Sequence, residues 1–327
     1  MKTCAALMGA LTLAGAADAA TAAPVQTYVE ATGPSGVLKG TMLAPEQAKG
    51  APVVLIIPGS GPTDRDGNNP LGVKASSYRL LAEGLADRGV ASVRIDKRGM
   101  FASAAALANP NDVTIDAYAD DALAWAESIK RQTGAPCVWI AGHSEGGLVA
   151  EVAAGKDSRK DVCGLVLISA AGRKLADVMR EQLKANPANA PLLDQALMAI
   201  AELEAGRRVD VSGFPPPLQG LFNPAVQGFV INDFSYDPVA LLKAYKGPVL
   251  VLQGTTDLQV SVAEDAQRLA DARPGVTLVV LDGVNHVLKA APADRAGNIA
   301  TYADPSLPLA PSVAEAVADF VKGAGGR

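Results

Sequence analysis

The chain has 327 residues, of which 49% are hydrophobic, and its formal net charge at neutral pH is −5. This acidic balance argues against nucleic acid or an anionic membrane surface as a partner, while the composition is typical of a soluble globular protein. The length suits one large domain with an insertion or two smaller domains.

The first residues have the parts of an export signal. Lys2 is followed by an alanine-rich apolar run from Ala5 to Ala17, and then by the motifs Ala17-Asp18-Ala19 and Ala20-Thr21-Ala22. A basic start, an apolar stretch and small residues at a cleavage point make up a secretory signal peptide, and the apolar run is too short to span a membrane. We therefore expect a signal peptide over residues 1–23, an exported protein that is periplasmic or extracellular, and no stable membrane insertion. An alanine-rich disordered tail is the alternative.

Apolar runs and turn residues predict two strands in a hairpin, followed by strands that alternate with helices. The predicted segments up to residue 169 are strands over 25–32, 36–43, 52–57 and 90–95, a helix around 78–85, a helix that begins after Thr114, a strand and helix around 138–154, and a strand over 165–169. Such alternation implies right-handed crossovers and a mostly parallel sheet with helices on both faces.

The most informative stretch is Gly142-His143-Ser144-Glu145-Gly146, which lies between a strand-like run and a helical pattern. A serine at the apex of a strand–turn–helix needs almost no side chain two positions before and after it. Its hydroxyl is then exposed, and the amides at the helix N-terminus point towards any negative charge formed there. Ser144 is the candidate nucleophile. The alternative is a glycine-rich turn whose serine caps the helix.

A serine needs a base, and the chain contains two histidines. The side chain of His143 should leave the turn in a different direction from its neighbour Ser144. His286, just past the strand-like run 277–281, is therefore the candidate base, and a surface loop histidine is the alternative interpretation.

The acid that orients the base should lie between Ser144 and His286 in the sequence. Asp257 follows the buried-strand run 248–253, and its carboxylate would hold the imidazole in the required tautomer. Asp265 lies inside the next predicted helix, and Asp282 is too close to a strand end. Asp237, which precedes Pro238, is a weaker alternative.

A loop rich in glycine and polar residues, 58–68, follows the predicted central strand. Such a loop suits backbone N–H groups that bind an oxyanion. We assign the oxyanion hole to the amide of Ser60 or Gly61 together with that of Glu145. A purely structural turn is the alternative.

The alternation of strands and helices stops between residues 173 and 246, where helices are predicted over 174–184 and 192–205 and Phe214-Pro215-Pro216-Pro217 breaks the chain before 218–234. An insertion at this point would cover the active site as a helical cap. The predicted core is then 24–172 and 247–327. In its second part, Ser261 and Ser312 each open a capping box that begins a helix.

Cys137 and Cys163 each lie just before a predicted strand, and those two strands should be neighbours. A disulfide between them and a pair of buried thiols are both compatible with the sequence. Cysteine and histidine do not cluster as metal ligands, so we expect no metal site.

Several motifs together resemble the serine α/β-hydrolases, and among them bacterial carboxylesterases of the serine-aminopeptidase-like group. The matching pieces are residues 58–68, Asp96-Lys97-Arg98-Gly99, 142–147, Phe234-Ser235-Tyr236-Asp237-Pro238, Gly254-Thr255-Thr256-Asp257 and Asn285-His286. The resemblance implies an α/β-hydrolase fold, hydrolysis of short-chain acyl esters without a cofactor, and Ser144, Asp257 and His286 as the catalytic triad. A peptidase, and a thioesterase or acyltransferase, are the rival activities. Glu202 and Glu204 are the candidate anchors for a peptide amine.

Overall fold

The computed structural model describes residues 23–107 and 113–325, so the predicted signal peptide lies outside the described residues except for its last position. Within them the chain forms an eight-stranded sheet in the order β1-β2-β4-β3-β5-β6-β7-β8. The strands are β1 (Val25–Gly33), β2 (Gly36–Ala44), β3 (Val53–Ile57), β4 (Ala91–Ile95), β5 (Val138–His143), β6 (Val162–Ile168), β7 (Val249–Gly254) and β8 (Val276–Leu281). β2 is antiparallel to β1 and β4, and the other neighbours are parallel. The mostly parallel sheet predicted from the sequence is confirmed.

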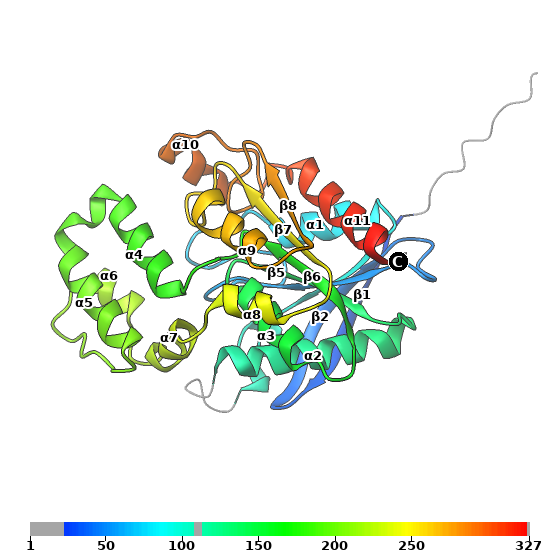
Figure 1. Ribbon diagram of the computed structural model, residues 1–327, viewed down its shortest axis with the longest axis horizontal. Helices are drawn as coiled ribbons and strands as arrows, with labels where there is room; N and C mark the ends of the chain where they lie inside the picture. Colours follow the sequence, from blue (N-terminus) through cyan, green and yellow to red (C-terminus); the bar gives the residue numbers. More distant parts are fainter. Residues whose placement is uncertain (1–22, 108–112, 326–327) are drawn as a thin grey trace, which may run out of the picture.

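Helices cover both faces of the sheet (Figure 1). On one face lie α1 (Ser77–Ala86) and α11 (Pro311–Gly325). On the other lie α2 (Ile115–Thr133), α3 (Glu145–Lys156), α8 (Pro238–Ala244) and α9 (Gln267–Asp271). The remaining helices and short helical turns are α4 (Leu175–Ala185), α5 (Leu193–Glu204), α6 (Pro216–Leu221), α7 (Gln227–Phe234), α10 (Arg295–Ala300), η1 (Phe101–Ala106), η3 (Pro187–Leu192), η4 (Val262–Ala266) and η5 (Thr301–Ala303).

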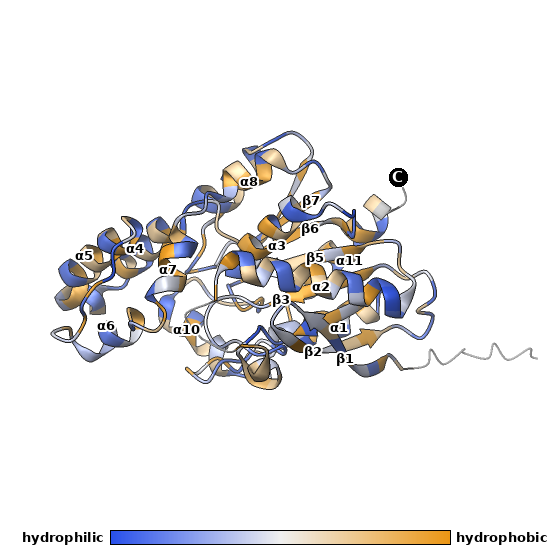
Figure 2. Cartoon of the chain, turned by 90° about the horizontal axis from the view of Figure 1, so that it is seen from below, coloured by the Kyte–Doolittle hydropathy of each residue, from blue (hydrophilic) through white to orange (hydrophobic). Residues whose placement is uncertain are grey.

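The continuous apolar run of β3 is explained by burial on both faces. Leu55 and Ile57 pack into the cluster under α2 and α3, whereas Val54 and Ile56 pack into the cluster under α1 and α11. Each side chain of this kind stabilises the fold by about 1.5–3 kcal/mol when it leaves water. Figure 2 accordingly shows β3 in orange, while the helices α4 and α5 alternate between blue and orange.

Helices α4 to α7 follow β6 and precede β7 in the sequence, and they extend to one side of the sheet (Figure 1). They have an apolar cluster of their own, with Phe222 and Phe234 fully buried in it. Helix α8 instead returns to the main core through Leu242. The boundaries of the cap at 173 and 246 remain a prediction. Pro224 lies between α6 and α7 and separates the two helices.

Thr114 and Ser261 cap the helices that follow them, although the capping box predicted at Ser261 is only half formed, because Ser261 N donates to Asp265 rather than to Glu264. The hydroxyl of Thr114 accepts a hydrogen bond from Ala117 N, and that of Ser261 accepts one from Glu264 N. The prediction for Ser312 was wrong, because α11 begins one residue earlier, at Pro311. Proline suits the first helical position, since its missing N–H would have no partner in the helix.

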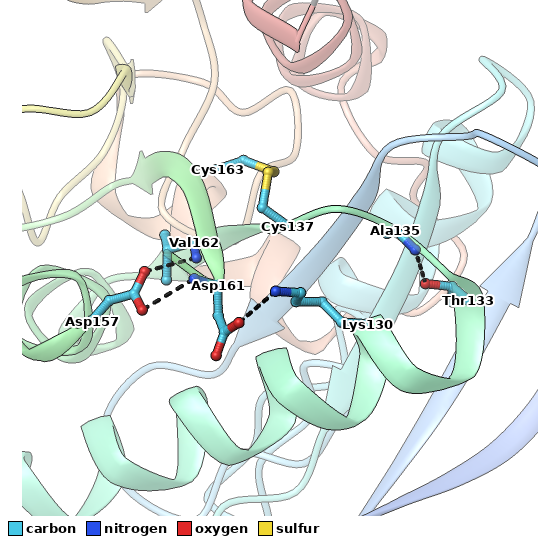
Figure 3. The surroundings of a disulfide bond; sticks show 8 residues. All are labelled: Lys130, Thr133, Ala135, Cys137, Asp157, Asp161, Val162 and Cys163. Carbon is cyan, nitrogen blue, oxygen red and sulfur yellow. Dashed lines mark hydrogen bonds and ion pairs between the residues drawn. A yellow bond between two sulfur atoms is a disulfide. The ribbon is translucent and has the colours of Figure 1, made fainter. Parts of the chain in front are cut away.

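Cys137 and Cys163 form a disulfide in the structure (Figure 3), with their Cα atoms 5.1 Å apart. Val138 pairs with Val162, but Trp139 pairs with Gly164, so Cys163 is an extra residue in a bulge of β6. A bulge bends its strand locally and turns the side chain at that position. It thereby allows the two sulfur atoms to meet across parallel strands.

Candidate active site

Ser144 occupies a sharp turn between β5 and α3. Its φ and ψ are 54° and −123°, a conformation that non-glycine residues rarely adopt. The flanking glycines permit this turn, because a Cβ atom at Gly142 would lie 2.0 Å from Gly146 O and one at Gly146 would lie 2.5 Å from Ile57 O. The serine is half-buried. Strain of this kind is typical of a functional residue that the surrounding packing holds in place.

His286 and Asp257 meet across the ends of β8 and β7. His286 Nδ1 lies 2.9 Å from Asp257 Oδ2. Burial acts to raise the pKa of Asp257, but the charge of His286 and hydrogen bonds from His286, Gln259 N and Val260 N outweigh it, so the pKa lies below its usual value. Asp257 therefore stays ionised and accepts a hydrogen bond from the Nδ1–H group of His286. That hydrogen bond leaves Nε2 of His286 free to accept a proton.

The other carboxylates considered from the sequence have different partners. Asp237 caps α8 by accepting a hydrogen bond from Ala240 N, Asp265 pairs with Arg173, and Asp282 accepts a hydrogen bond from the hydroxyl of Thr255. The geometry thus leaves Asp257 as the partner of the imidazole.

His143 connects the nucleophile turn to the loop of His286. Its Nε2 lies 2.8 Å from His286 O, and its Nδ1 lies 2.8 Å from Tyr78 Oη. Burial, and then the charge of His286, lower the pKa of His143 to about 3, so the ring is neutral. Because the carbonyl of His286 can only accept a hydrogen bond, Nε2 of His143 carries the ring proton. Nδ1 of His143 therefore accepts a hydrogen bond from the hydroxyl of Tyr78. The rings of the two histidines are 4.8 Å apart at their centroids.

Ser144 Oγ forms no hydrogen bond among the described residues, as is common before a substrate binds. His143, which directly precedes it, nonetheless fixes the backbone of the candidate base. The structure thus brings the regions of Ser144, Asp257 and His286 to the carboxyl edge of the parallel strands, where α/β proteins place their ligand sites.

The loop after β3 lies beside the nucleophile because β3 pairs with β5, with Ile57 opposite Gly142. A Cβ atom at Gly59 would lie 3.1 Å from Ser144 Cβ, so a side chain at this position would crowd the nucleophile. Within the described part of the chain, the amides of Ser60, Gly61 and Glu145 donate no hydrogen bond to the protein. These amides are therefore available to a negatively charged oxygen near Ser144.

Sequence reasoning missed the contributions of Tyr78, Lys97 and Gln253. Tyr78 appeared only as an apolar position of a helix, and Lys97 only as part of a motif after a strand. Gln253 Nε2 donates to Asp257 Oδ2 over 3.0 Å. The one signal that could have found Gln253 was a polar residue inside an apolar strand run.

Residues 23–107 and 113–325 contain no group of three or more His, Cys, Asp or Glu side chains placed to hold a metal ion. None of their helices has the length and apolar character required to cross a membrane.

A sequence model of the alpha/beta hydrolase family matches residues 53–300. Esterase EstD from Thermotoga maritima is 26% identical over 257 residues, which are 77% of this chain and 58% of that protein, so the chain spans less than two thirds of the relative's length. A thermophilic esterase from Thermogutta terrifontis matches with a TM-score of 0.55 and 19% identity over 91% of this chain and 99% of the other. Est1E from Butyrivibrio proteoclasticus matches with a TM-score of 0.56 and 17% identity over 92% of this chain and 99% of the other. At such identities the two structures establish a shared fold.

Proposed function

Because the chain belongs to the alpha/beta hydrolase family, we propose that it is a serine hydrolase that cleaves short-chain carboxylic esters. Ser144 is the nucleophile, His286 the general base and Asp257 the acid that orients it. The hydrogen bond between His286 Nδ1 and the buried, ionised Asp257 carries this proposal, since it fixes the tautomer that can accept a proton from serine. The esterase activity named for the Thermotoga maritima relative supports the choice of substrate.

The reaction proceeds through an acyl-enzyme. His286 Nε2 takes the Ser144 proton as Oγ attacks the ester carbonyl, and the carbonyl oxygen becomes an oxyanion. The C–O bond to the leaving group then breaks, and His286 returns the proton to the departing alcohol. Water attacks the acyl-serine in the same way, with its proton passing through His286, and releases the carboxylic acid.

The oxyanion hole is formed by the amide of Glu145 with that of Ser60 or Gly61. All three amides lack a protein partner in the described structure, and Gly59 packs against Ser144. In serine hydrolases the loss of one such donor costs about 2.7–4 kcal/mol of transition-state stabilisation.

Ester hydrolysis is favoured over aminopeptidase activity by the state of the two candidate anchor residues. Glu202 pairs with Arg207, and Glu204 pairs with Arg180. Each carboxylate thus has a cation of its own chain as partner. A carboxylate that binds the amino terminus of a peptide would need to be free of such a partner.

Export to the periplasm or the extracellular space is the location that we propose. It is supported by the leader at residues 1–23 and by the disulfide, since disulfides persist in oxidising compartments. Expression in a bacterial host followed by fractionation and N-terminal sequencing tests this. We expect a mature chain that begins between about Ala20 and Pro24. An unprocessed chain confined to the cytosol would contradict it.

The activity is tested by comparing a p-nitrophenyl acetate or butyrate substrate with an aminoacyl p-nitroanilide. We expect turnover of the esters, none of the anilide, and none of either by Ser144→Ala. A fluorophosphonate that labels the wild type and fails to label Ser144→Ala would identify the nucleophile independently. Anilide turnover without ester turnover would contradict the proposal.

A further inference from the structure

The amide of Ser60 belongs to the peptide unit whose carbonyl is that of Gly59. Strands β3 and β4 are parallel, with Ile56 opposite Arg94, and the loops beyond them keep Gly59 beside Lys97. Lys97 Nζ donates a hydrogen bond of 2.7 Å to Gly59 O. Lys97 is buried, so water does not compete for this bond. The ammonium group therefore fixes the carbonyl of this peptide unit.

A fixed carbonyl also fixes the amide on the other side of the same peptide unit. In a planar trans peptide the C=O and N–H groups point in opposite directions. The described chain has no cis peptide bond. The Ser60 N–H consequently points away from the buried Lys97. The preceding peptide unit is held as well, because Gly59 N donates to Tyr78 Oη over 3.1 Å.

The same ammonium group also contacts the side chain of Glu145, the residue whose amide is the second arm of the oxyanion hole. Lys97 Nζ lies 3.3 Å from Glu145 Oε1, and Glu145 provides the other candidate amide. We propose that Lys97 is a positioning residue, which holds both arms of the oxyanion hole at the distance that a tetrahedral oxyanion requires. This inference rests on the proposed ester hydrolysis and assigns a role to the Asp96-Lys97-Arg98-Gly99 motif.

The surroundings of Lys97 suit a buried cation. The carboxylate of Glu145 is buried beside it, and the ring of Tyr118 lies 5.2 Å from Nζ. Asp233 of α7 faces the same group; burial and then the charge of Glu145 raise its pKa, while Lys97 opposes that shift. A methionine at position 97 would retain much of the volume and lose both hydrogen bonds.

The experiment compares Lys97→Met with the wild type on a p-nitrophenyl ester. Displacing an oxyanion donor leaves ground-state binding intact, so we expect kcat to fall on the order of 10²-fold while KM stays within about twofold. A trifluoromethyl ketone forms a hemiketal with the serine and places a negative oxygen in the hole. Its inhibition constant should rise by the same factor as kcat/KM falls. An unchanged kcat, or an inhibition constant that does not follow kcat/KM, would overturn the inference.

Lys97→Met leaves the Glu145 carboxylate buried without its cation, which can destabilise the fold. Lys97→Met/Glu145→Gln removes that charge and should show the same loss of kcat at unchanged KM. Retention of wild-type kcat by this folded double variant would refute the inference.

Lys130→Met is the matched control, since Lys130 pairs with the buried Asp161 near the disulfide, away from the site (Figure 3). We expect this control to lose thermal stability and to keep kcat. A control that loses kcat as Lys97→Met does would also count against the inference. A wild type that hydrolyses no ester would refute the proposed function instead, so the two failures are distinguishable.

Discussion

Asp257→Asn should reverse the hydrogen bond that orients the base. Asp257 Oδ1 accepts from Gln259 N and Val260 N, at 2.8 and 3.0 Å. These two amides can only donate, so the carbonyl oxygen of an asparagine must take this position. Its NH2 group then replaces Oδ2 and faces His286 Nδ1 and the donating Nε2 of Gln253.

The asparagine would select the wrong tautomer of His286. An N–H directed at Nδ1 requires a lone pair there, so the imidazole proton moves to Nε2 and the ring can no longer accept the proton of Ser144. The same change in a serine protease lowers kcat by about 10⁴-fold, which corresponds to about 5.5 kcal/mol of activation free energy. We expect a loss of this order, together with some loss of stability because two NH2 groups now face one another.

The measurement is kcat and kcat/KM on a p-nitrophenyl ester, with thermal unfolding as a check on folding. Asp237→Asn is the matched control, because Asp237 is the rival acid and asparagine caps helices about as well as aspartate. We expect the control to retain activity within about twofold, since cap substitutions of this kind change stability by only a few tenths of a kcal/mol. A folded Asp257→Asn variant with activity within about tenfold of the wild type would refute the assignment of the acid.

Three further outcomes follow from the structure. Ser144→Ala should fold normally and lose at least about 10⁴-fold in kcat; comparable turnover by both proteins would refute the triad. The denatured, unreduced mature protein should contain no free thiol, and Cys137→Ala should lower the free energy of unfolding by about 3.5 kcal/mol for a loop of 26 residues; two reactive thiols per chain would contradict the disulfide. Glu151 is buried, and neither of its carboxylate oxygens has a hydrogen-bond partner among the described residues. Burial raises its pKa well above 4.5, so the wild type should lose stability relative to Glu151→Gln as pH rises above 4.5, by up to about 1.4 kcal/mol per pH unit until the folded-state pKa is reached; denaturant midpoints of the two proteins that shift in parallel from pH 4 to 8 would refute this.

The elements that were predicted correctly have local signals. The run 52–57 is apolar at every position, because β3 is buried on both faces, and Thr114 carries its own cap. The position of Ser144 was recognisable because its turn requires glycine on both sides within a few residues. The prediction for Ser312 failed because two helix-start signals are adjacent there. Ser312 has the sequence of a cap, but Pro311 takes the first helical position.

The polar network around the site could not be predicted, because it depends on strand register. Lys97 reaches Gly59 only if β3 and β4 pair with Ile56 opposite Arg94, and nothing in either strand's own residues specifies that alignment. Tyr78 likewise reaches His143 from a helix that packs on the sheet from elsewhere in the chain. Motifs thus identified the reacting groups, while the groups that hold them emerge from tertiary packing.

The location of the disulfide follows from the register of another pair of strands, β5 and β6, and it makes the disulfide a matter of stability rather than of catalysis. Cys137 directly precedes β5, and Ser144 directly follows it, so the bridge ties the start of the strand whose end carries the nucleophile. The bulge at Cys163 lies at the same end of the sheet, opposite the carboxyl edge where His286 and Asp257 meet. A disulfide acts mainly by restricting the unfolded chain. Its reduction should therefore lower resistance to denaturant and leave kcat unchanged, because the disulfide lies at the end of the sheet opposite the site.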